Sequence, residues 1–355
     1  MNFVTGATGH IGNVLVRELV ARGERVRALL FPGEDRRPLE GLAVEIVEGD
    51  VLDSNMLRRA MRGARRVFHL AGIISIMPGK QETMRQVNVE GTKNVIAACR
   101  EAHVERLIYT SSIHAIAAAP EGQVIDESLP FDPNRAWGGY DKTKAEASRA
   151  VQHAVQEGLD AVIVCPTGVI GPHDYRGSMF GEFLMDCASP RPHMYIDGAY
   201  DFVDVRDVAR GHILAAERGR CGEAYILSGG RITVRQIIEA VEDFTGRFRP
   251  KFKVPVWLVK TLSYFTPVWY RAAKRTPRFT PYSIHTVLSN SHISADKARR
   301  ELGYKSRPLV QSIADAVAWM VSYRRLKLVP ERVEHSPQPA LGRRPGSTQR
   351  TRRRS

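Results

Sequence analysis

Three glycines close to the start of the chain constrain its fold more than any other feature. Gly6, Gly9 and Gly12 follow a short apolar run and precede an amphipathic helical pattern. This order predicts a strand, a tight turn and a helix. Gly6 lets the chain turn, Gly9 admits a phosphate close to the backbone, and Gly12 lets the helix pack on the strand. The free N–H groups at the helix start would face the anion, so we expect a dinucleotide to bind here.

Alternating strand and helix patterns predict the fold class. Strands are expected over residues 3–5, 25–30, 44–47, 66–70, 106–110, 161–165 and 224–227. Helices are expected over residues 11–22, 54–61, 81–102, 139–157, 205–217, 234–245, 295–302 and 310–323. Repeated βαβ units of this kind predict an α/β protein with a parallel, doubly wound sheet, in which ligands bind at the carboxyl ends of the strands.

Cysteine usage and the position of the first strand bear on metals and location. The four cysteines show neither CxxC pairing nor the spacing of a zinc site: Cys99, Cys165, Cys187 and Cys221. We interpret them as small buried thiols in a reducing compartment and expect no metal. Because removal of a signal peptide would also remove the glycine turn, we expect a cytoplasmic protein.

Positive charge is concentrated in two regions of a chain whose net charge is +14. Residues 244–295 contain no acidic side chain, and apolar and basic residues are interleaved over 250–278. This pattern fits either contact with an anionic membrane surface or a helical cap over the substrate, and Pro255 and Pro267 favour the cap. Residues 330–355 predict a disordered basic tail. No recognisable nucleic-acid module is present, so no specific nucleic-acid partner is expected.

Tyr140 and Lys144 are four residues apart in a predicted helix, so their side chains lie on one face. Tyrosine is a poor acid or base at neutral pH, but a neighbouring ammonium lowers the pKa of the phenol. The same spacing recurs in Tyr270 with Lys274 and in Tyr323 with Lys327. The first pair is favoured because it follows the nucleotide-binding pattern and lies 28 residues after Ser112, at the end of a predicted strand.

Seven sequence motifs occur in a characteristic order: TGATGHIG at 5–12, GDVLD at 49–53, HLAG at 69–72, NVEGT at 88–92, YTSS at 109–112, YDKTK at 140–144 and CPTGVIGP at 165–172. On these motifs, residues 1–325 resemble the extended short-chain dehydrogenase/reductase family, nearest to dihydroflavonol reductases and 3β-hydroxysteroid dehydrogenases. The resemblance implies a Rossmann domain over 1–170, rejoined by about 201–230. It also implies a smaller, mostly helical substrate-binding domain over 171–200 and 231–329.

The resemblance also implies the roles of individual residues. Tyr140 would be the general acid/base, Lys144 would lower its pKa and hold the nicotinamide ribose, and Ser112 would hydrogen-bond the substrate oxygen. Tyr140 and Lys144 would contact the cofactor, together with Gly6, Thr8, Gly9, His10, Ile11, Gly12, Asp50, Val51, Leu70, Ala71, Gly72, Pro166 and Val169. Asp50 and Val51 would flank the adenine.

The choice of cofactor depends on the end of the second strand, where an acidic residue favours NAD and an arginine favours NADP. The sequence there is RVRALLFPGEDRR, with Phe31 where relatives often carry arginine. Arg27, Arg36 and Arg37 could reach a phosphate, whereas Glu34 and Asp35 could serve a ribose. We therefore expect NAD(P)(H), with a preference for NADP(H).

The expected reaction interconverts a ketone and a secondary alcohol on a small apolar, steroid- or flavonoid-like substrate, which the apolar residues 73–77 would suit. One alternative is a nucleotide-sugar epimerase or dehydratase. Another is a nucleotide-sensing protein without catalysis, which an intact set of Ser112, Tyr140 and Lys144 disfavours. A homodimer is expected by analogy, through the helices over 81–102 and 139–157.

Overall fold

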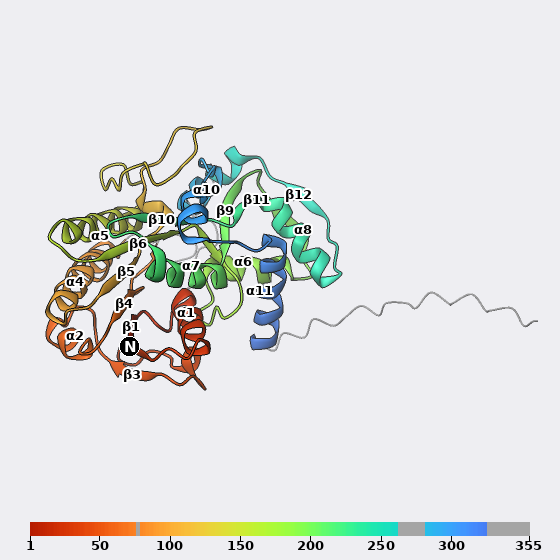
Figure 1. Ribbon diagram of the computed structural model, residues 1–355. Helices are drawn as coiled ribbons and strands as arrows, with labels where there is room; N and C mark the ends of the chain where they lie inside the picture. The colour runs from red at the N-terminus through yellow and green to blue at the C-terminus, as the bar shows by residue number, and fades with distance from the viewer. Residues whose placement is uncertain (76–78, 262–280, 325–355) are drawn as a thin grey trace, which may run out of the picture.

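A seven-stranded parallel sheet forms the centre of the computed structural model, which describes residues 1–75, 79–261 and 281–324 (Figure 1). The strands are β1 (Asn2–Thr5), β2 (Val26–Leu30), β3 (Glu45–Glu48), β4 (Arg66–His69), β5 (Arg106–Thr110), β6 (Ala161–Pro166) and β10 (Ala224–Leu227). Their spatial order is β10-β6-β5-β4-β1-β2-β3. From β1 the chain builds β2 and β3 on one side and β4, β5 and β6 on the other, so the strand order reverses beside β1. In doubly wound sheets this reversal opens a crevice at the carboxyl ends of the strands, where ligands bind.

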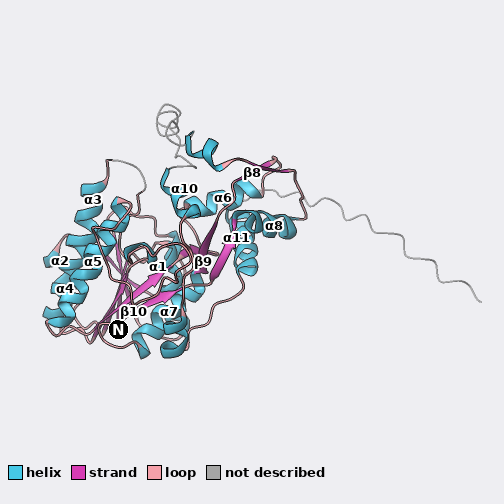
Figure 2. Cartoon of the chain, turned by 90° about the horizontal axis from the view of Figure 1, so that it is seen from above, coloured by secondary structure: helices cyan, strands magenta, loops and turns pink. Residues whose placement is uncertain are grey.

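Helices cover both faces of this sheet (Figure 2). One face carries α1 (His10–Ala21) and α7 (Val205–Arg218), and the other carries α2 (Ser54–Ala60), α4 (Gly91–Glu101) and α5 (Gly139–Gln156). Adjacent residues of β1 point to opposite faces: Phe3 packs in the cluster beneath α2, α4 and α5, and Val4 in the cluster beneath α1 and α7. Both side chains are fully buried, as expected of a strand covered on two sides. The predicted doubly wound α/β fold is confirmed.

The helix expected over 81–102 is interrupted by a wider turn. It consists of α3 (Gln81–Arg85), the π-helical segment η2 (Gln86–Glu90) and α4. Within the wider turn the Asn88 amide reaches Ile73 and Thr143, and the Thr92 hydroxyl donates to the Asn88 carbonyl at 2.6 Å. Such local widening is frequent at functional sites. Short helical turns also occur as η1 (Arg37–Leu39), η3 (Ile113–Ala115) and η4 (Ala298–Leu302).

A smaller lobe lies beside the main sheet. It contains a three-stranded sheet in the order β11-β9-β7 and the pair β12-β8. The strands are β7 (Gly168–Ile170), β8 (His193–Tyr195), β9 (Ala199–Asp204), β11 (Gly230–Thr233) and β12 (Lys251–Lys253). The helices are α6 (Met179–Cys187), α8 (Val234–Thr245), α10 (Pro281–Leu288) and α11 (Leu309–Arg324). Neither α6 nor α10 was expected: both are short, α6 follows the glycine- and proline-containing stretch 171–178, and α10 begins at a proline.

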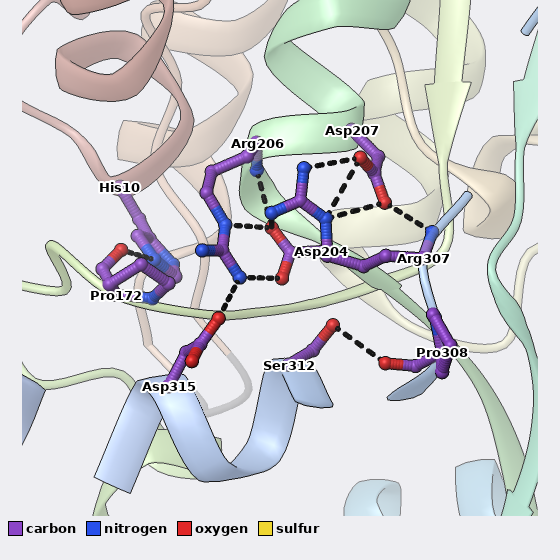
Figure 3. Close-up of polar contacts among 9 residues, drawn as sticks. All are labelled: His10, Pro172, Asp204, Arg206, Asp207, Arg307, Pro308, Ser312 and Asp315. Atoms are coloured by element: carbon purple, nitrogen blue, oxygen red, sulfur yellow. Dashed lines mark hydrogen bonds and ion pairs between the residues drawn. The ribbon is translucent and has the colours of Figure 1, made fainter. Parts of the chain in front are cut away.

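An ion-pair network fastens α11 to the N-terminus of α7 (Figure 3). The Arg206 guanidinium lies between the carboxylates of Asp204 and Asp315, at 2.7 and 2.6 Å. Arg307, which precedes α11, pairs with Asp207 at 2.8 Å. Because Asp204 and Asp207 are buried, each carboxylate depends on its arginine for compensation. The last described helix is thereby tied to an element that packs on the main sheet.

Several expectations concern location, thiols and the basic segments. Within the described residues no helix combines the length and apolar character needed to cross a bilayer. Cys221 is exposed, which corrects the interpretation of all four thiols as buried: it follows α7 in a surface turn. The expected tail over 330–355, most of the basic stretch over 250–278, and residues 76–77 of the apolar loop lie outside the described residues.

Candidate active site

The glycine turn has the geometry that its sequence predicts. Gly6 adopts a φ of 66°, and a Cβ added there would lie 2.7 Å from the amide nitrogen of Ala71. A Cβ on Gly12 would lie 2.1 Å from the Gly6 carbonyl oxygen, so only glycine lets α1 start this close to β1. Gly9 precedes α1 as its N-cap and supplies no side-chain hydrogen bond. The first N–H groups of the helix therefore remain for an anion, and the cradle fits a dinucleotide pyrophosphate.

The end of β4 is held against this turn. The Thr5 hydroxyl accepts a hydrogen bond from the Ala71 amide at 3.1 Å and lies 2.7 Å from Nδ1 of His69. Leu70, Ala71 and Gly72 therefore follow β4 directly beside the glycine turn, and their contact with the cofactor stays a prediction. A Cβ on Gly72 would lie 4.0 Å from Nζ of Lys144, so this cleft-side segment adjoins the lysine.

The other residues expected to contact the cofactor come from several elements around the glycine turn. Val51 is buried against Gly91, and the Asp50 carboxylate accepts a hydrogen bond from the Leu52 amide at 3.0 Å. Nε2 of His10 lies 3.0 Å from the Pro172 carbonyl, so its ring is turned towards the segment after β7 (Figure 3). Thr8 is buried in the glycine turn itself. The remaining expected residues lie at the start of α1, at the end of β6 and in β7: Ile11, Pro166 and Val169.

Ser112 and Tyr140 are brought together from different elements. Ser112 follows β5 and is buried, and its hydroxyl accepts a hydrogen bond from the His114 amide at 3.2 Å. Tyr140 lies in the first turn of α5. Burial raises the pKa of Tyr140 to about 12, and a hydrogen bond with the Ser112 hydroxyl acts in the opposite direction. The serine therefore both caps a short turn and contacts the phenol.

The Lys144 side chain is hydrogen-bonded to residues of β5. Its ammonium donates to the Thr110 carbonyl at 2.5 Å and to the Tyr109 hydroxyl at 3.3 Å. Burial lowers the pKa of Lys144 to about 8. Burial raises the pKa of Tyr140, and the Lys144 ammonium is hydrogen-bonded to the end of β5, so the expected lowering of the Tyr140 pKa by Lys144 stays a prediction.

Asn88 is a positioning residue that the sequence reasoning did not single out. Its side-chain oxygen accepts from the Ile73 amide at 2.7 Å, and its amide group donates to the Ile73 carbonyl at 3.0 Å. The same amide group donates to the Thr143 hydroxyl at 3.1 Å. One side chain thus holds the loop after β4 against α5. Its place in the NVEGT motif was the available signal.

A polar and aromatic group from the smaller lobe also reaches the start of α5. The Tyr282 hydroxyl of α10 donates to the buried Asp141 carboxylate at 2.6 Å. Nε2 of His114 lies 3.0 Å from the Tyr200 hydroxyl of β9, and the two rings are stacked. Trp137 stacks on His285 with ring centroids 4.1 Å apart. The smaller lobe therefore contacts both α5, which carries Tyr140, and η3, which follows Ser112.

The other tyrosine–lysine spacings do not form a described alternative site. Tyr270 and Lys274 lie outside the described residues, as does Lys327. Tyr323 packs against Trp319 and Tyr175, with ring centroids 4.8 and 5.1 Å apart. This contact is an aromatic packing cluster on α11. Among the described side chains, no group of three or more His, Cys, Asp or Glu residues is placed to hold a metal ion.

The three arginines expected to reach a phosphate all have partners, and Arg27 lies at the start of β2, away from its carboxyl end. Arg36 pairs with Glu48, and Arg37 pairs with Asp35 at 2.7 Å. Arg27 pairs with Glu45 at 2.8 Å, and its guanidinium also donates to backbone carbonyls before β4. Arg36 and Arg37 are exposed, so an incoming phosphate could exchange with their carboxylate partners at small cost.

Comparison with known proteins agrees with this geometry. The model of the NAD dependent epimerase/dehydratase family matches residues 2–228. Sterol demethylase protein B of Methylococcus capsulatus is 38% identical over 89% of this chain and 97% of its own length. A 4-hydroxy-2-methyl-3-oxo-4-farnesyl-3,4-dihydroquinoline-1-oxide ketoreductase of Stigmatella aurantiaca is 31% identical over 89% of this chain and 95% of its own length. A 3 beta-hydroxysteroid dehydrogenase/Delta 5-->4-isomerase of Mycobacterium tuberculosis is 29% identical over 90% of each.

Solved structures show the same architecture. The crystal structure of gox2253 superposes with a TM-score of 0.81 at 34% identity, covering 92% of this chain and 99% of the other. The dTDP-glucose 4,6-dehydratase DesIV of Streptomyces venezuelae, solved with NAD, gives a TM-score of 0.73 at 22% identity. That alignment covers 91% of this chain and 98% of DesIV, and at this identity it shows the fold alone.

Proposed function

The chain belongs to the NAD-dependent epimerase/dehydratase family, within its extended short-chain dehydrogenase/reductase branch, and from this premise we propose its reaction and substrate class. It interconverts a ketone and a secondary alcohol on a small apolar, steroid- or flavonoid-like ring substrate. One arrangement carries the proposal: the Ser112 hydroxyl acts on the Tyr140 phenol, and Lys144 of the same helix adjoins Gly72, in the segment after β4 that lies beside the glycine turn.

The nicotinamide cofactor supplies or accepts the hydride when it is bound. In the reductive direction, the carbonyl oxygen gains negative charge as its carbon gains hydride, and hydroxyl donors at that oxygen stabilise the charge. Ser112 donates a hydrogen bond there, and Tyr140 transfers its phenolic proton to the oxygen. Because burial raises the pKa of Tyr140 to about 12, the phenol holds its proton at neutral pH, which suits the reductive direction.

Lys144 and the residues of the glycine turn would hold the cofactor. We assign the pyrophosphate to the free N–H groups of the turn, and the nicotinamide ribose to Lys144 beside Gly72. Leu70, Ala71, Pro166 and Val169 would line the same crevice. We propose a preference for NADP(H), because Arg36 and Arg37 are exposed at the end of β2, where the ribose 2′ substituent of a dinucleotide is read.

The substrate class is supported by the names of relatives and by the side chains near Tyr140. Relatives at 29% and 31% identity are named for reactions on steroid and quinoline ring systems. In this chain aromatic side chains gather near the start of α5: His114 stacks on Tyr200, and the Tyr282 ring contacts both His114 and Trp137. Such side chains suit a ring ketone better than a sugar diphosphate. A nucleotide-sugar epimerase or dehydratase would instead return the cofactor to its starting state.

The test is the Tyr140→Phe variant, which removes the transferable proton and keeps the ring. We expect loss of turnover by at least about a hundredfold, because general acid catalysis contributes on this order. The affinity for NADPH, followed by nicotinamide fluorescence, should stay nearly unchanged. A panel of steroids, flavonoids, simple ketones and nucleotide sugars, read at the nicotinamide absorbance, would identify the substrate class. Full activity of Tyr140→Phe would contradict the mechanism.

A further inference from the structure

The segment between β7 and α6 leaves the smaller lobe and lies along the start of α1. Three contacts fasten it there. The Pro172 carbonyl lies 3.0 Å from Nε2 of His10, the His173 carbonyl accepts from the Asn13 amide group at 3.1 Å, and the Tyr175 hydroxyl accepts from Arg17 at 3.2 Å. The residue that follows these three anchors is Arg176. Hydrogen bonds between the preceding residues and α1 therefore fix the position of Arg176 over the glycine turn.

Arg176 connects the glycine turn with the end of β2. Its guanidinium donates to the Thr8 hydroxyl at 3.0 Å and forms an ion pair with Glu34. The second oxygen of the Glu34 carboxylate accepts from the Phe31 amide at 3.2 Å. Thr8 and Glu34 are 26 residues apart: Thr8 lies in the turn after β1 and Glu34 in the loop after β2. An arginine from the smaller lobe thus spans the two turns at which a dinucleotide would be held.

The end of the second strand is where proteins of this architecture read the ribose 2′ position. A carboxylate there accepts a hydrogen bond from the 2′-hydroxyl of NAD and repels the 2′-phosphate of NADP. Glu34 provides such a carboxylate, and its ion pair with Arg176 compensates the negative charge. The planar fork of a guanidinium matches the geometry of both a carboxylate and a phosphate. Arg176 can therefore leave the Glu34 carboxylate and bind a phosphate instead.

We propose that Arg176 and Glu34 form an ion pair, shared between the two lobes, that decides which coenzyme the protein accepts. With NAD(H), Arg176 stays on Glu34 and the carboxylate accepts the 2′-hydroxyl. With NADP(H), the guanidinium moves to the 2′-phosphate and offsets the repulsion from Glu34. This inference rests on the proposed function in one respect: a dinucleotide must bind at the glycine turn.

The experiment measures binding rather than turnover, by titration calorimetry with ADP-ribose and 2′-phospho-ADP-ribose. Neither probe carries a nicotinamide ring, so the results do not depend on catalysis. We compare the wild-type chain with Arg176→Ala, Glu34→Gln and the double variant. Arg220→Ala is the matched control, because Arg220 is similarly exposed and pairs with Glu301 away from the glycine turn.

Arg176→Ala should weaken 2′-phospho-ADP-ribose by about tenfold or more, since hydrogen bonds to charged groups have this magnitude, and should change ADP-ribose much less. Glu34→Gln should strengthen the phosphorylated probe and weaken ADP-ribose. The double variant should bind the phosphorylated probe better than Arg176→Ala does, because no unpaired carboxylate remains. The control should resemble wild type.

Equal weakening of both probes by Arg176→Ala would overturn the inference, because the residue would then serve the shared pyrophosphate or the loop alone. Unchanged affinities in Arg176→Ala and Glu34→Gln would overturn it as well. If the wild-type chain bound neither probe, the cofactor site of the proposed function would fail together with the inference. Binding of both probes with no discrimination between variants would remove the inference and leave the proposed function intact.

Discussion

Tyr140 and Lys144 lie one helical turn apart, yet burial moves their pKa values in opposite directions. The cause is the same for both side chains. Loss of water disfavours the phenolate of Tyr140, which raises its pKa, and disfavours the ammonium of Lys144, which lowers its pKa. The site therefore holds a protonated phenol beside an ammonium that can lose its proton near pH 8.

The lowered pKa of Lys144 predicts a cost in stability that depends on pH. Below pH 8 both the folded and the unfolded chain carry the ammonium, so the burial cost is fully present. Between pH 8 and 10.5 the folded chain has released the proton and the unfolded chain still binds it, so the free energy of unfolding rises with pH. Lys144→Met should therefore be more stable than wild type at pH 6, and the difference should shrink towards pH 10.5.

Denaturant unfolding at several pH values, with activity measured in parallel, checks this prediction. Lys142→Met is the control, because Lys142 is exposed on the same helix. Lys144→Met should lose activity although it gains stability, as expected where a functional charge is buried at a cost. A stability difference that is independent of pH would show that packing, rather than the ammonium charge, determines the effect.

At the scale of elements, local sequence patterns predicted the main sheet and most of its helices. The glycine turn and the stretch from Tyr140 to Lys144 could be located because each depends on neighbours in the chain. Asn88, Arg176 and Tyr282 could not be assigned in this way: their partners lie 15, 142 and 141 residues away. The three-stranded sheet was missed because β7, β9 and β11 do not take part in the regular alternation of strand and helix that identified the main sheet.

The junction between β1 and α1 predicts different effects for two glycines in one turn. Gly12→Ala should destabilise the protein even without cofactor, because its Cβ would lie 2.1 Å from a backbone oxygen that cannot move aside easily. The cost should be about 3 kcal/mol, the upper part of the usual range for overpacked sites. Gly9→Ala should lose much less stability, since its Cβ would meet the Gly6 oxygen at 3.2 Å, a tight contact that a small shift relieves, but it should lose affinity for NADPH.

Thermal unfolding of the cofactor-free variants, followed by NADPH titration, separates these two effects. Equal destabilisation by both substitutions would mean that the turn is limited by backbone conformation rather than by the close approach of α1. Retention of full NADPH affinity in Gly9→Ala would contradict the proposed position of the pyrophosphate.

At the scale of the whole molecule, the outer faces of α4 and α5 are available for assembly. Arg100 of α4 pairs with Glu157 at the end of α5, so the two helices present one continuous surface. We propose that two copies of the chain pair through it. Substitution of the exposed Ala97 by glutamate should then shift the sedimentation coefficient from dimer to monomer, because a buried unpaired charge is costly.

Ala21→Glu is the control for this prediction, since Ala21 is an exposed alanine on α1, away from α4 and α5. It should leave the sedimentation coefficient unchanged. A wild-type chain that sediments as a monomer at micromolar concentration would refute the proposed pairing. A dimer that persists in Ala97→Glu would place the interface elsewhere on the surface.

The arrangement of β7, β9 and β11 has a consequence for protein engineering. These strands are neighbours in space, but helices that belong to the main sheet or to the smaller lobe separate them along the chain. No single crossover point can therefore exchange the smaller lobe for that of a relative. A folded chimaera has to import several non-contiguous stretches at once. It also has to import the partner of every residue that bridges the two lobes, because the contacts between the lobes are otherwise lost.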